Sequence, residues 1–345
     1  MDQGFEDAPR DSLVVTGLGA VIAGPNVTGG WRREDAGARW DDARAPILDF
    51  RSLAECIDPT PYLKVQKQRK YMGTQDDLAV VAAGRAIESA GLGNGALGER
   101  AGLYLVVGHI PFGQDDIDAL FAASLENGRF SMPCFSTAGL RAVNGLLTFR
   151  CLPNMPAFHI SVNFDIQGPY FVSYPGPGQL YLVLEEASAA LWAGDIDVAL
   201  VGGVAHQRNF LVEHHFSRVD HPVPADRLLD AGGCLVVETA EHARRRGAPM
   251  RGALVSFETA YLAHSPFDES IAPLEQFEVC SMHMVHSENP SRNVNPDLTD
   301  ALGPASLPAL LSAAANRGPC RIQHRLQSRD GIRATSHWEL EGSRW

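Results

Sequence analysis

The sequence lacks the segments that send proteins into or across membranes. No N-terminal stretch combines basic residues with an apolar run, so we expect no secretory signal. No apolar run approaches the roughly 20 residues that a membrane-spanning helix needs. These absences exclude a membrane protein and favour a cytoplasmic location.

Closely spaced cysteines and a basic excess are lacking as well. The 6 cysteines lie far apart and form no tight framework, which favours reduced thiols in a cytosolic protein. Lys and Arg number 29 against 41 Asp and Glu, giving a net charge of -12. Contacts to phosphates need a basic face, so this balance excludes nucleic acid as an expected partner.

What remains is a globular pattern of alternating strands and helices. The 345 residues suffice for one large domain or two closely packed halves. Apolar runs predict strands at 13–19, 103–108, 169–174, 197–203, 234–238, 254–262 and 332–340. Helical spacing predicts helices at 76–90, 114–126, 178–193, 240–246 and 306–316. This order predicts an α/β fold in layers, with sheets covered on both faces.

Other segments give weaker signals. Residues 24–75 predict mostly loop with short helical pieces, and residues 134–166 favour helix over strand. Residues 265–300 are rich in Pro, Asn, Ser and His, and we expect a loop there. Within the helix at 178–193, the spacing predicts that five side chains face inward: Leu182, Leu184, Ala187, Ala190 and Leu191.

Five segments together carry a resemblance to a known family. They are 14–21, 77–92, 153–169, 193–204 and 230–248. In this order and spacing they are similar to the first half of the β-ketoacyl synthases, a branch of the thiolase superfamily. The resemblance covers residues 12–265 well and the remainder poorly. It implies a thiolase-like layered αβαβα fold, with an N-terminal half at 12–250 and a shortened C-terminal half at 251–345.

The resemblance locates the position of the catalytic nucleophile. In this family a cysteine opens the helix after a Gly-Pro strand, and the positive helix terminus helps to make its thiolate. Counting without gaps from the Gly-Pro pair at 168–169, that position falls on Pro177. Proline has no nucleophile, and no cysteine lies between Cys151 and Cys234.

The two histidines that the family uses are missing in the same way. One belongs to a His-Gly-Thr motif, which this sequence lacks. The other falls on Asp300, and the glycine-rich gating loop is absent around 334–337. Three separate losses predict no catalytic residues, no cofactor, no metal and no condensation by this chain alone.

The family contains silent members of this kind. Chain-length factors lack the cysteine, commonly replaced by glutamine, and pair tightly with an active synthase to help set the length of a polyketide or polyene chain on an acyl carrier protein. The resemblance therefore implies a non-catalytic partner of an active β-ketoacyl synthase. A homodimer is the competing arrangement. Gln179 lies close to the nucleophile position, although Pro177 occupies it.

The implied heterodimer assigns residues to an interface. The expected interface strand consists of Tyr170, Phe171, Val172, Ser173 and Tyr174. Its apolar and aromatic edge would aggregate if left unpaired. Bulky residues from 111–121 or 130–149 would reach the acyl tunnel of the partner. A solvated face is the default interpretation of four basic residues that could also meet an acidic carrier protein: Lys64, Lys67, Arg69 and Lys70.

A different reading is an enzyme with relocated chemistry. The run at 280–288 contains Cys280, His283, His286 and Glu288, which could supply acyl-transfer groups or metal ligands. Its spacing fits no standard zinc pattern, and a polar loop is the simpler interpretation.

Overall fold

The computed structural model describes residues 9–23, 54–93, 97–219, 222–261, 274–281, 291–294, 301–316 and 318–341. Two predictions fall outside these ranges. Asp300 is one, and most of the run at 280–288 is the other. Within the described part of the chain, no helix is both long and apolar enough to cross a bilayer.

An 11-stranded sheet has the order β11-β10-β12-β13-β9-β1-β8-β7-β3-β6, with β2 beside β1. The strands of the first half are β1 (Leu13–Ala23), β2 (Ala54–Glu55), β3 (Ala101–Val107), β6 (Tyr170–Ser173), β7 (Val198–Ala205) and β8 (Ala231–Thr239). Those of the second half are β9 (Gly252–Tyr261), β10 (Leu274–Ser281), β11 (Ser291–Val294), β12 (Cys320–Gln327) and β13 (Ile332–Leu340). Because β3 is parallel to β6 and β7, the carboxyl ends of these three strands share one edge.

The outer helices α1 (Thr74–Ser89) and α6 (Met155–Phe164) cover one face of the first-half strands. The helix predicted at 76–90 is confirmed, and every residue from Gln75 to Gly84 is buried. Asp76 accepts the backbone N–H of Gly73 at 2.7 Å, which supports the first turn. Gly91, at φ 65°, ends the helix in a conformation that favours glycine.

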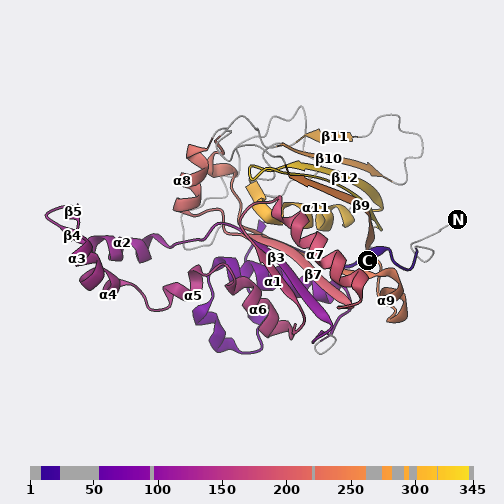
Figure 1. The fold of residues 1–345 in the computed structure, drawn as a ribbon, viewed down its shortest axis with the longest axis horizontal. Coiled ribbons are helices and arrows are strands. Elements are labelled where there is room, and N and C mark those ends of the chain that lie inside the picture. The colour runs from indigo at the N-terminus through magenta and orange to yellow at the C-terminus, as the bar shows by residue number, and fades with distance from the viewer. Residues whose placement is uncertain are drawn as a thin grey trace.

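Helices α7 (Gln179–Ala193) and α11 (Ser306–Ala315) lie between the two parts of the sheet. Figure 1 shows them above β3 and β7 and below β9, β10 and β12. Their apolar faces share one core with first-half and second-half strands. In α7 the inward prediction is right for Leu184, Ala187 and Leu191, whereas Leu182 is only half-buried and Tyr181 takes an inner position.

The second half of the sheet departs from two predictions. The loop expected at 265–300 is wrong in part, because β10 and β11 lie within it. The expectation of sheets covered on both faces also fails here, since β12 and β13 alternate buried with more exposed residues. On the outer face, polar side chains pair across strands, as in the Arg321–Glu339 ion pair at 2.8 Å.

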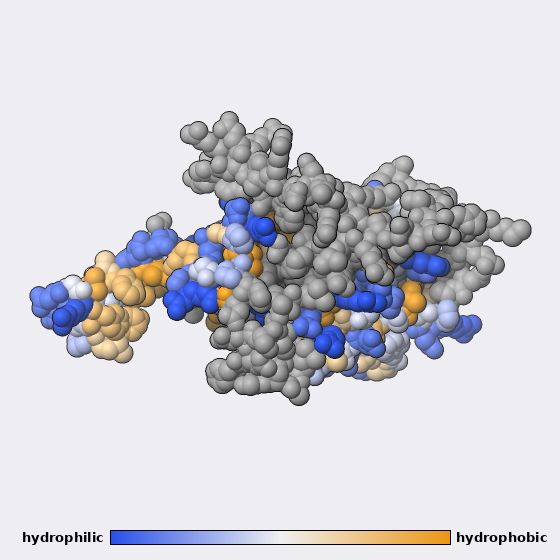
Figure 2. Space-filling model, turned by 90° about the horizontal axis from the view of Figure 1, so that it is seen from above, coloured by the Kyte–Doolittle hydropathy of each residue, from blue (hydrophilic) through white to orange (hydrophobic). Residues whose placement is uncertain are grey.

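Short elements project from the body as an arm, residues 110–152. It contains α2 (Gln114–Ala123), β4 (Leu125–Glu126), β5 (Arg129–Phe130), α3 (Met132–Cys134), a π-helix (Phe135–Gly139), α4 (Leu140–Ala142) and α5 (Leu147–Cys151). Figure 2 shows hydrophobic residues along its surface. The large exposed apolar side chains of the arm are Phe121, Leu125, Phe130, Met132, Leu140, Phe149 and Leu152.

The remaining helices connect these layers. They are the 3-10 helices Thr60–Tyr62, Gln66–Tyr71, Ala225–Arg227 and Gly303–Ala305, together with α8 (Phe210–Arg218) and α9 (Ala240–Arg245). The first two confirm the short helical pieces expected before residue 75.

Candidate functional site at the start of helix α7

Side chains that could take part in a reaction lie together where the parallel strands end. His109 follows β3, Tyr174 follows β6 and His206 follows β7. Helix α7 begins beside the same edge at Gln179. In open α/β sheets, ligands bind outside the carboxyl ends of the strands, so this edge is the candidate site.

Pro177 lies directly before the first turn of α7. Its carbonyl accepts the backbone N–H of Leu180 at 3.2 Å, and Gly178 is the N-cap residue. The assignment of Pro177 to the nucleophile position stays a prediction. The side chain itself offers neither a nucleophile nor a proton donor.

Both ends of the Gln179 amide make a hydrogen bond to the protein. Its Oε1 accepts the hydroxyl of Ser173 at 2.6 Å, and its Nε2 donates to Oδ2 of Asp330 at 2.7 Å. The Ser328 hydroxyl also donates to Asp330. Both ends of the Gln179 amide are therefore used in holding the strand, the helix and the turn after β12 together.

The two imidazoles of His109 and His215 lie in ring contact. Their centroids are 4.7 Å apart, and the Tyr174 ring lies 6.0 Å from His109. Burial, with the nearby His215, lowers the pKa of His109 to about 4. His109 is therefore neutral at pH 7, whereas His215 is exposed.

An imidazole and a carboxylate also lie close together at this edge. His206 Nδ1 is 3.0 Å from Oδ1 of Asp230, close enough for an ion pair when the imidazole is protonated. The same oxygen accepts the backbone N–H of Arg208 at 2.8 Å. Nδ1 of His206 nevertheless makes no hydrogen bond in this geometry, so Asp230 does not hold the imidazole in the way that an oriented general base requires.

Behind the first turn of α7 lies a buried polar network. The Tyr181 hydroxyl is 2.5 Å from Nδ1 of His324 and 2.7 Å from the Ser336 hydroxyl. Trp338 Nε1 also donates to Ser336 at 2.7 Å. These four buried side chains join α7 to β12 and β13 and fix the helix against the second half.

The two buried cysteines supply no thiolate to the candidate site, and the described residues supply no cluster of metal ligands. Burial raises the pKa of Cys234 to about 12 and that of Cys320 to about 11, so neither is a thiolate at neutral pH. Across the described ranges, no group of three or more His, Cys, Asp or Glu gathers as metal ligands.

The predicted interface strand forms the end of the sheet. β6 pairs with β3 on one side and is last in the strand order. Tyr170 is 70% exposed and Phe171 40%, with Tyr174 exposed beside them. An exposed aromatic edge of this kind is suited to pairing with another chain.

The basic cluster lies on the 3-10 helix Gln66–Tyr71 and just before it, at Lys64. Lys64, Lys67, Arg69 and Lys70 are all exposed. Arg69 pairs with Asp77 at 2.6 Å, and Lys70 Nζ lies 4.6 Å from the Tyr71 ring centroid. The cluster keeps accessible positive charge in an otherwise acidic chain.

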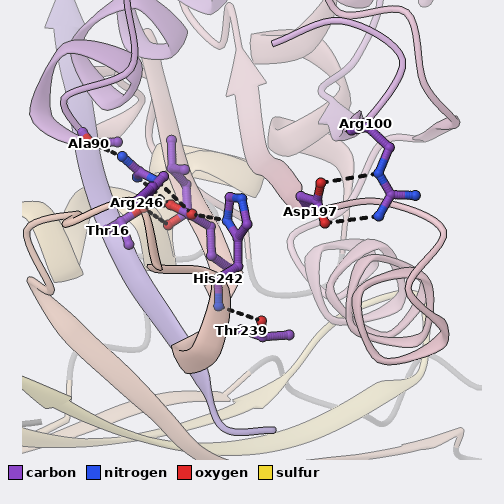
Figure 3. Close-up of polar contacts among 9 residues, drawn as sticks. Thr16, Ala90, Arg100, Asp197, Thr239, His242 and Arg246 are labelled. Atoms are coloured by element: carbon purple, nitrogen blue, oxygen red, sulfur yellow. Dashed lines mark hydrogen bonds and ion pairs between the residues drawn. The ribbon is translucent and has the colours of Figure 1, made fainter. Parts of the chain in front are cut away.

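The densest ionic cluster lies elsewhere, where β8 passes into α9 (Figure 3). Buried Glu238 binds Arg246, His242 and the Thr16 hydroxyl, and Arg246 also donates to the carbonyl of Ala90. Glu238 pairs with the first residue of β7, so the cluster is at the opposite end of that strand from His206. We interpret it as structural.

Comparison with known proteins gives the family. The model described as "Beta-ketoacyl synthase, N-terminal domain" matches residues 30–226, more than half of the chain. The chain therefore belongs to the β-ketoacyl synthase family, and the predicted family is confirmed.

Two curated relatives match part of the chain. A 3-oxoacyl-[acyl-carrier-protein] synthase 2 of Coxiella burnetii is 24% identical over 71% of this chain and 62% of its own length. A mitochondrial 3-oxoacyl-[acyl-carrier-protein] synthase of Arabidopsis thaliana is 26% identical over 36% of this chain and 31% of its own. The chain thus matches under two thirds of the length of either relative.

Solved structures confirm the thiolase-like α/β fold. A type II polyketide ketosynthase bound to its acyl carrier protein and a hexaketide aligns at TM-score 0.64 and 15% identity, covering 95% of this chain and 99% of its own. The ishigamide ketosynthase/chain length factor aligns at 0.58 and 17%, covering 97% and 100%.

Two side chains at this edge, those of His109 and Asp330, were not predicted from the sequence as site residues. His109 had a weak signal, because it follows the glycine that ends a predicted strand. Asp330 had none, since its role depends on contact with Gln179, 151 positions earlier in the chain. The Asp300 position remains outside the described residues.

Proposed function

We propose that this chain is a non-catalytic, chain-length-factor-like partner of an active β-ketoacyl synthase. It would act in polyketide, polyene or fatty-acyl chain biosynthesis on an acyl carrier protein. The observation that carries the proposal is Pro177 just before α7, at the position where we expect the nucleophile of the family. The similarity in fold to a ketosynthase/chain length factor supports it.

The state of the neighbouring groups points the same way. Gln179 could stand in for the glutamine of chain-length factors only if its amide were available. Its oxygen and nitrogen are instead bound to Ser173 and Asp330. A role in decarboxylation is therefore not part of the proposal, which leaves shaping of the partner's acyl tunnel.

The proposed contact surface consists of the β6 edge and the arm. Tyr170 and Phe171 would pair with the synthase along the end of the sheet, and apolar arm residues such as Phe130 and Met132 would be covered by it. Exposed aromatic and methionine side chains are typical of the centre of protein interfaces. Burial of both surfaces would remove the aggregation risk of the free chain.

Carrier-protein docking would use charge. The exposed cluster of Lys64, Lys67, Arg69 and Lys70 could attract an acidic carrier protein to the complex. Reversing the charge at Lys67 with Lys67→Glu should therefore slow this association.

Co-expression with a candidate synthase tests the heterodimer. We expect the mass in solution to be that of a complex with one copy of each chain. Tyr170→Arg should weaken the affinity of the two chains at least tenfold, because it places a charge in the interface. Val255→Arg, at an exposed apolar residue of β9, is the matched control and should leave pairing intact. A stable monomer, or a homodimer that ignores the synthase and leaves its products unchanged, would remove the proposal.

The isolated chain provides the second test. Incubated with malonyl- and acyl-loaded carrier protein, it should give no extended product, because no thiol stands at the start of α7. Any condensation product would contradict a non-catalytic role.

The alternative is a stand-alone enzyme with relocated acyl-transfer or metal-dependent chemistry. The His206–Asp230 pair at the candidate edge is the observation that favours it. A hydrolytic or transfer activity of the purified chain that His206→Ala abolishes would support this alternative, and so would stoichiometric zinc in the protein.

A further inference from the structure

A turn from the second half of the chain lies against the start of α7. Residues 328–331 connect β12 to β13, and the turn is braced by its own hydrogen bonds. Ser328 donates its backbone N–H to the carbonyl of Ile332 at 2.9 Å, and Gly331 donates to Ser328 at 3.1 Å. The Ser328 hydroxyl adds bonds to Asp330 and to Ile332. The 328–331 turn is therefore a defined structure.

The turn packs closely against the two glycines on either side of Pro177, whose own side chain is half-buried. A Cβ on Gly176 would lie 2.9 Å from Oδ2 of Asp330. A Cβ on Gly178 would lie 2.8 Å from Cβ of Ile332 and 3.0 Å from Oδ1 of Asp330. Real Cβ atoms do not approach a neighbouring Cβ as closely as 2.8 Å, so glycine is needed at position 178 for the turn to close. At position 176 a Cβ would displace only the end of the Asp330 side chain.

Asp330 holds the closed position. Its carboxylate accepts from Nε2 of Gln179 at 2.7 Å, and Gln179 is fixed in turn by Ser173 of β6. A negative charge near the N-terminus of a 15-residue helix is also favoured by the helix dipole. Two elements of the first half and one of the second are therefore tied at a single point.

We propose that the 328–331 turn is a fixed closure that shuts the acyl-binding position of this chain. Loss of the nucleophile and closure of the position are then separate features, and replacing the proline alone would not reopen the position. In the heterodimer that we propose above, only the synthase would then carry an acyl chain on a nucleophile. This consequence rests on the proposed function, whereas the closure is a property of this chain alone.

A cysteine introduced as a reporter tests the closure. In Pro177→Cys, the rate of alkylation by iodoacetamide at pH 9 is measured by peptide mapping, with the exposed Cys56 in the same molecule as reference. Both thiols meet the same reagent in the same sample, so the comparison reports access. We expect position 177 to react at least about tenfold more slowly than Cys56.

Opening the closure should restore reactivity. Adding Asp330→Ala or Gln179→Leu removes the same hydrogen bond from opposite sides, and either should bring the rate at position 177 to within about threefold of that at Cys56. Asp118→Ala is the matched control, because it removes a Gln114–Asp118 bond of the same 2.7 Å length from the exposed arm. It should leave position 177 slow.

The outcomes separate the closure from the proposed function. Fast alkylation of Pro177→Cys alone, or continued slow alkylation in both folded double variants, would overturn the closure. Neither result bears on pairing with a synthase. Failure to pair would overturn the proposed function and leave the alkylation rates as predicted.

Discussion

Glu238 and Arg246 form a two-pronged ion pair in which the carboxylate is completely buried. Arg246 Nη2 lies 2.5 Å from Oε1, and Nε lies 2.7 Å from Oε2. The Arg246 guanidinium also reaches the carbonyl of Ala90 at the end of α1. One side chain thus satisfies a buried charge and ties α1 to β8 and α9.

Removing the arginine should be costly. Arg246→Leu leaves the Glu238 charge with less compensation, and we expect a loss of about 3–5 kcal/mol in the free energy of unfolding. Arg100→Ala is the control, since it breaks the more exposed Arg100–Asp197 pair of Figure 3, where solvent screens the charges, and should cost much less. Urea unfolding of both variants measures the difference, and equal losses would contradict it.

The buried network behind α7 should contribute to stability through a single hydroxyl. Tyr181→Phe removes the group shared by His324 and Ser336, with an expected loss of about 1–3 kcal/mol. Tyr62→Phe breaks an exposed bond to Glu88 and should cost much less. Thermal unfolding compares the two, and an unchanged Tm for Tyr181→Phe would show that the network is unimportant.

The inward face of α7 should not tolerate charge. Leu184→Asp would bury an unpaired carboxylate in the core shared by both halves, and we expect no folded protein to be recovered. Ala189→Asp makes the same change at an exposed position of the same helix and should express normally. Normal yield and an unchanged Tm for Leu184→Asp would refute the packing of α7.

Stability should depend on pH through the first turn of α1. Burial raises the pKa of Asp76 to about 7, although the Gly73 N–H that it accepts opposes the rise. A raised pKa favours the folded state while the carboxyl is protonated. The stabilisation that Asp76 gives the folded state is therefore complete below the ordinary pKa near 4 and is lost as the pH rises through about 7.

Asp76→Asn isolates this effect, because the amide oxygen can still accept from Gly73. Between pH 5 and pH 8 the wild-type protein should lose on the order of 2 kcal/mol more than the variant. Asp77, with a pKa raised by burial to about 6, remains in both proteins and cancels in the comparison. Parallel pH profiles of urea unfolding would contradict the prediction.

The elements that the sequence predicted are those whose signals are local. β3, β7 and β8 are apolar runs that are buried along their length, and α1 combines helical spacing with a glycine stop. The start of α7 was also predictable, because glycines and prolines precede it and apolar residues follow at helical spacing. Burial on both sides leaves a strand little choice of residue, so composition alone identifies it.

The second half was harder to predict because its strands depend on partners. β10 has only a short alternation of Gln276, Phe277, Glu278 and Val279, and it exists as a strand because β12 and β11 pair with it on both sides. β12 escaped prediction for a similar reason, since half of its residues are polar and face outward. Pattern reasoning cannot supply a distant hydrogen-bonding partner.

The sequence by itself determined the family, the layered fold and the absence of a cysteine at the start of α7. Those features depend on residue types in order along the chain. Only the tertiary structure decided that Gln179 is bound to Asp330, that Tyr181 meets His324 and that glycines on either side of Pro177 receive a turn from the second half. Each of these contacts joins residues that are distant in sequence, and folding alone brings them within hydrogen-bonding or van der Waals distance.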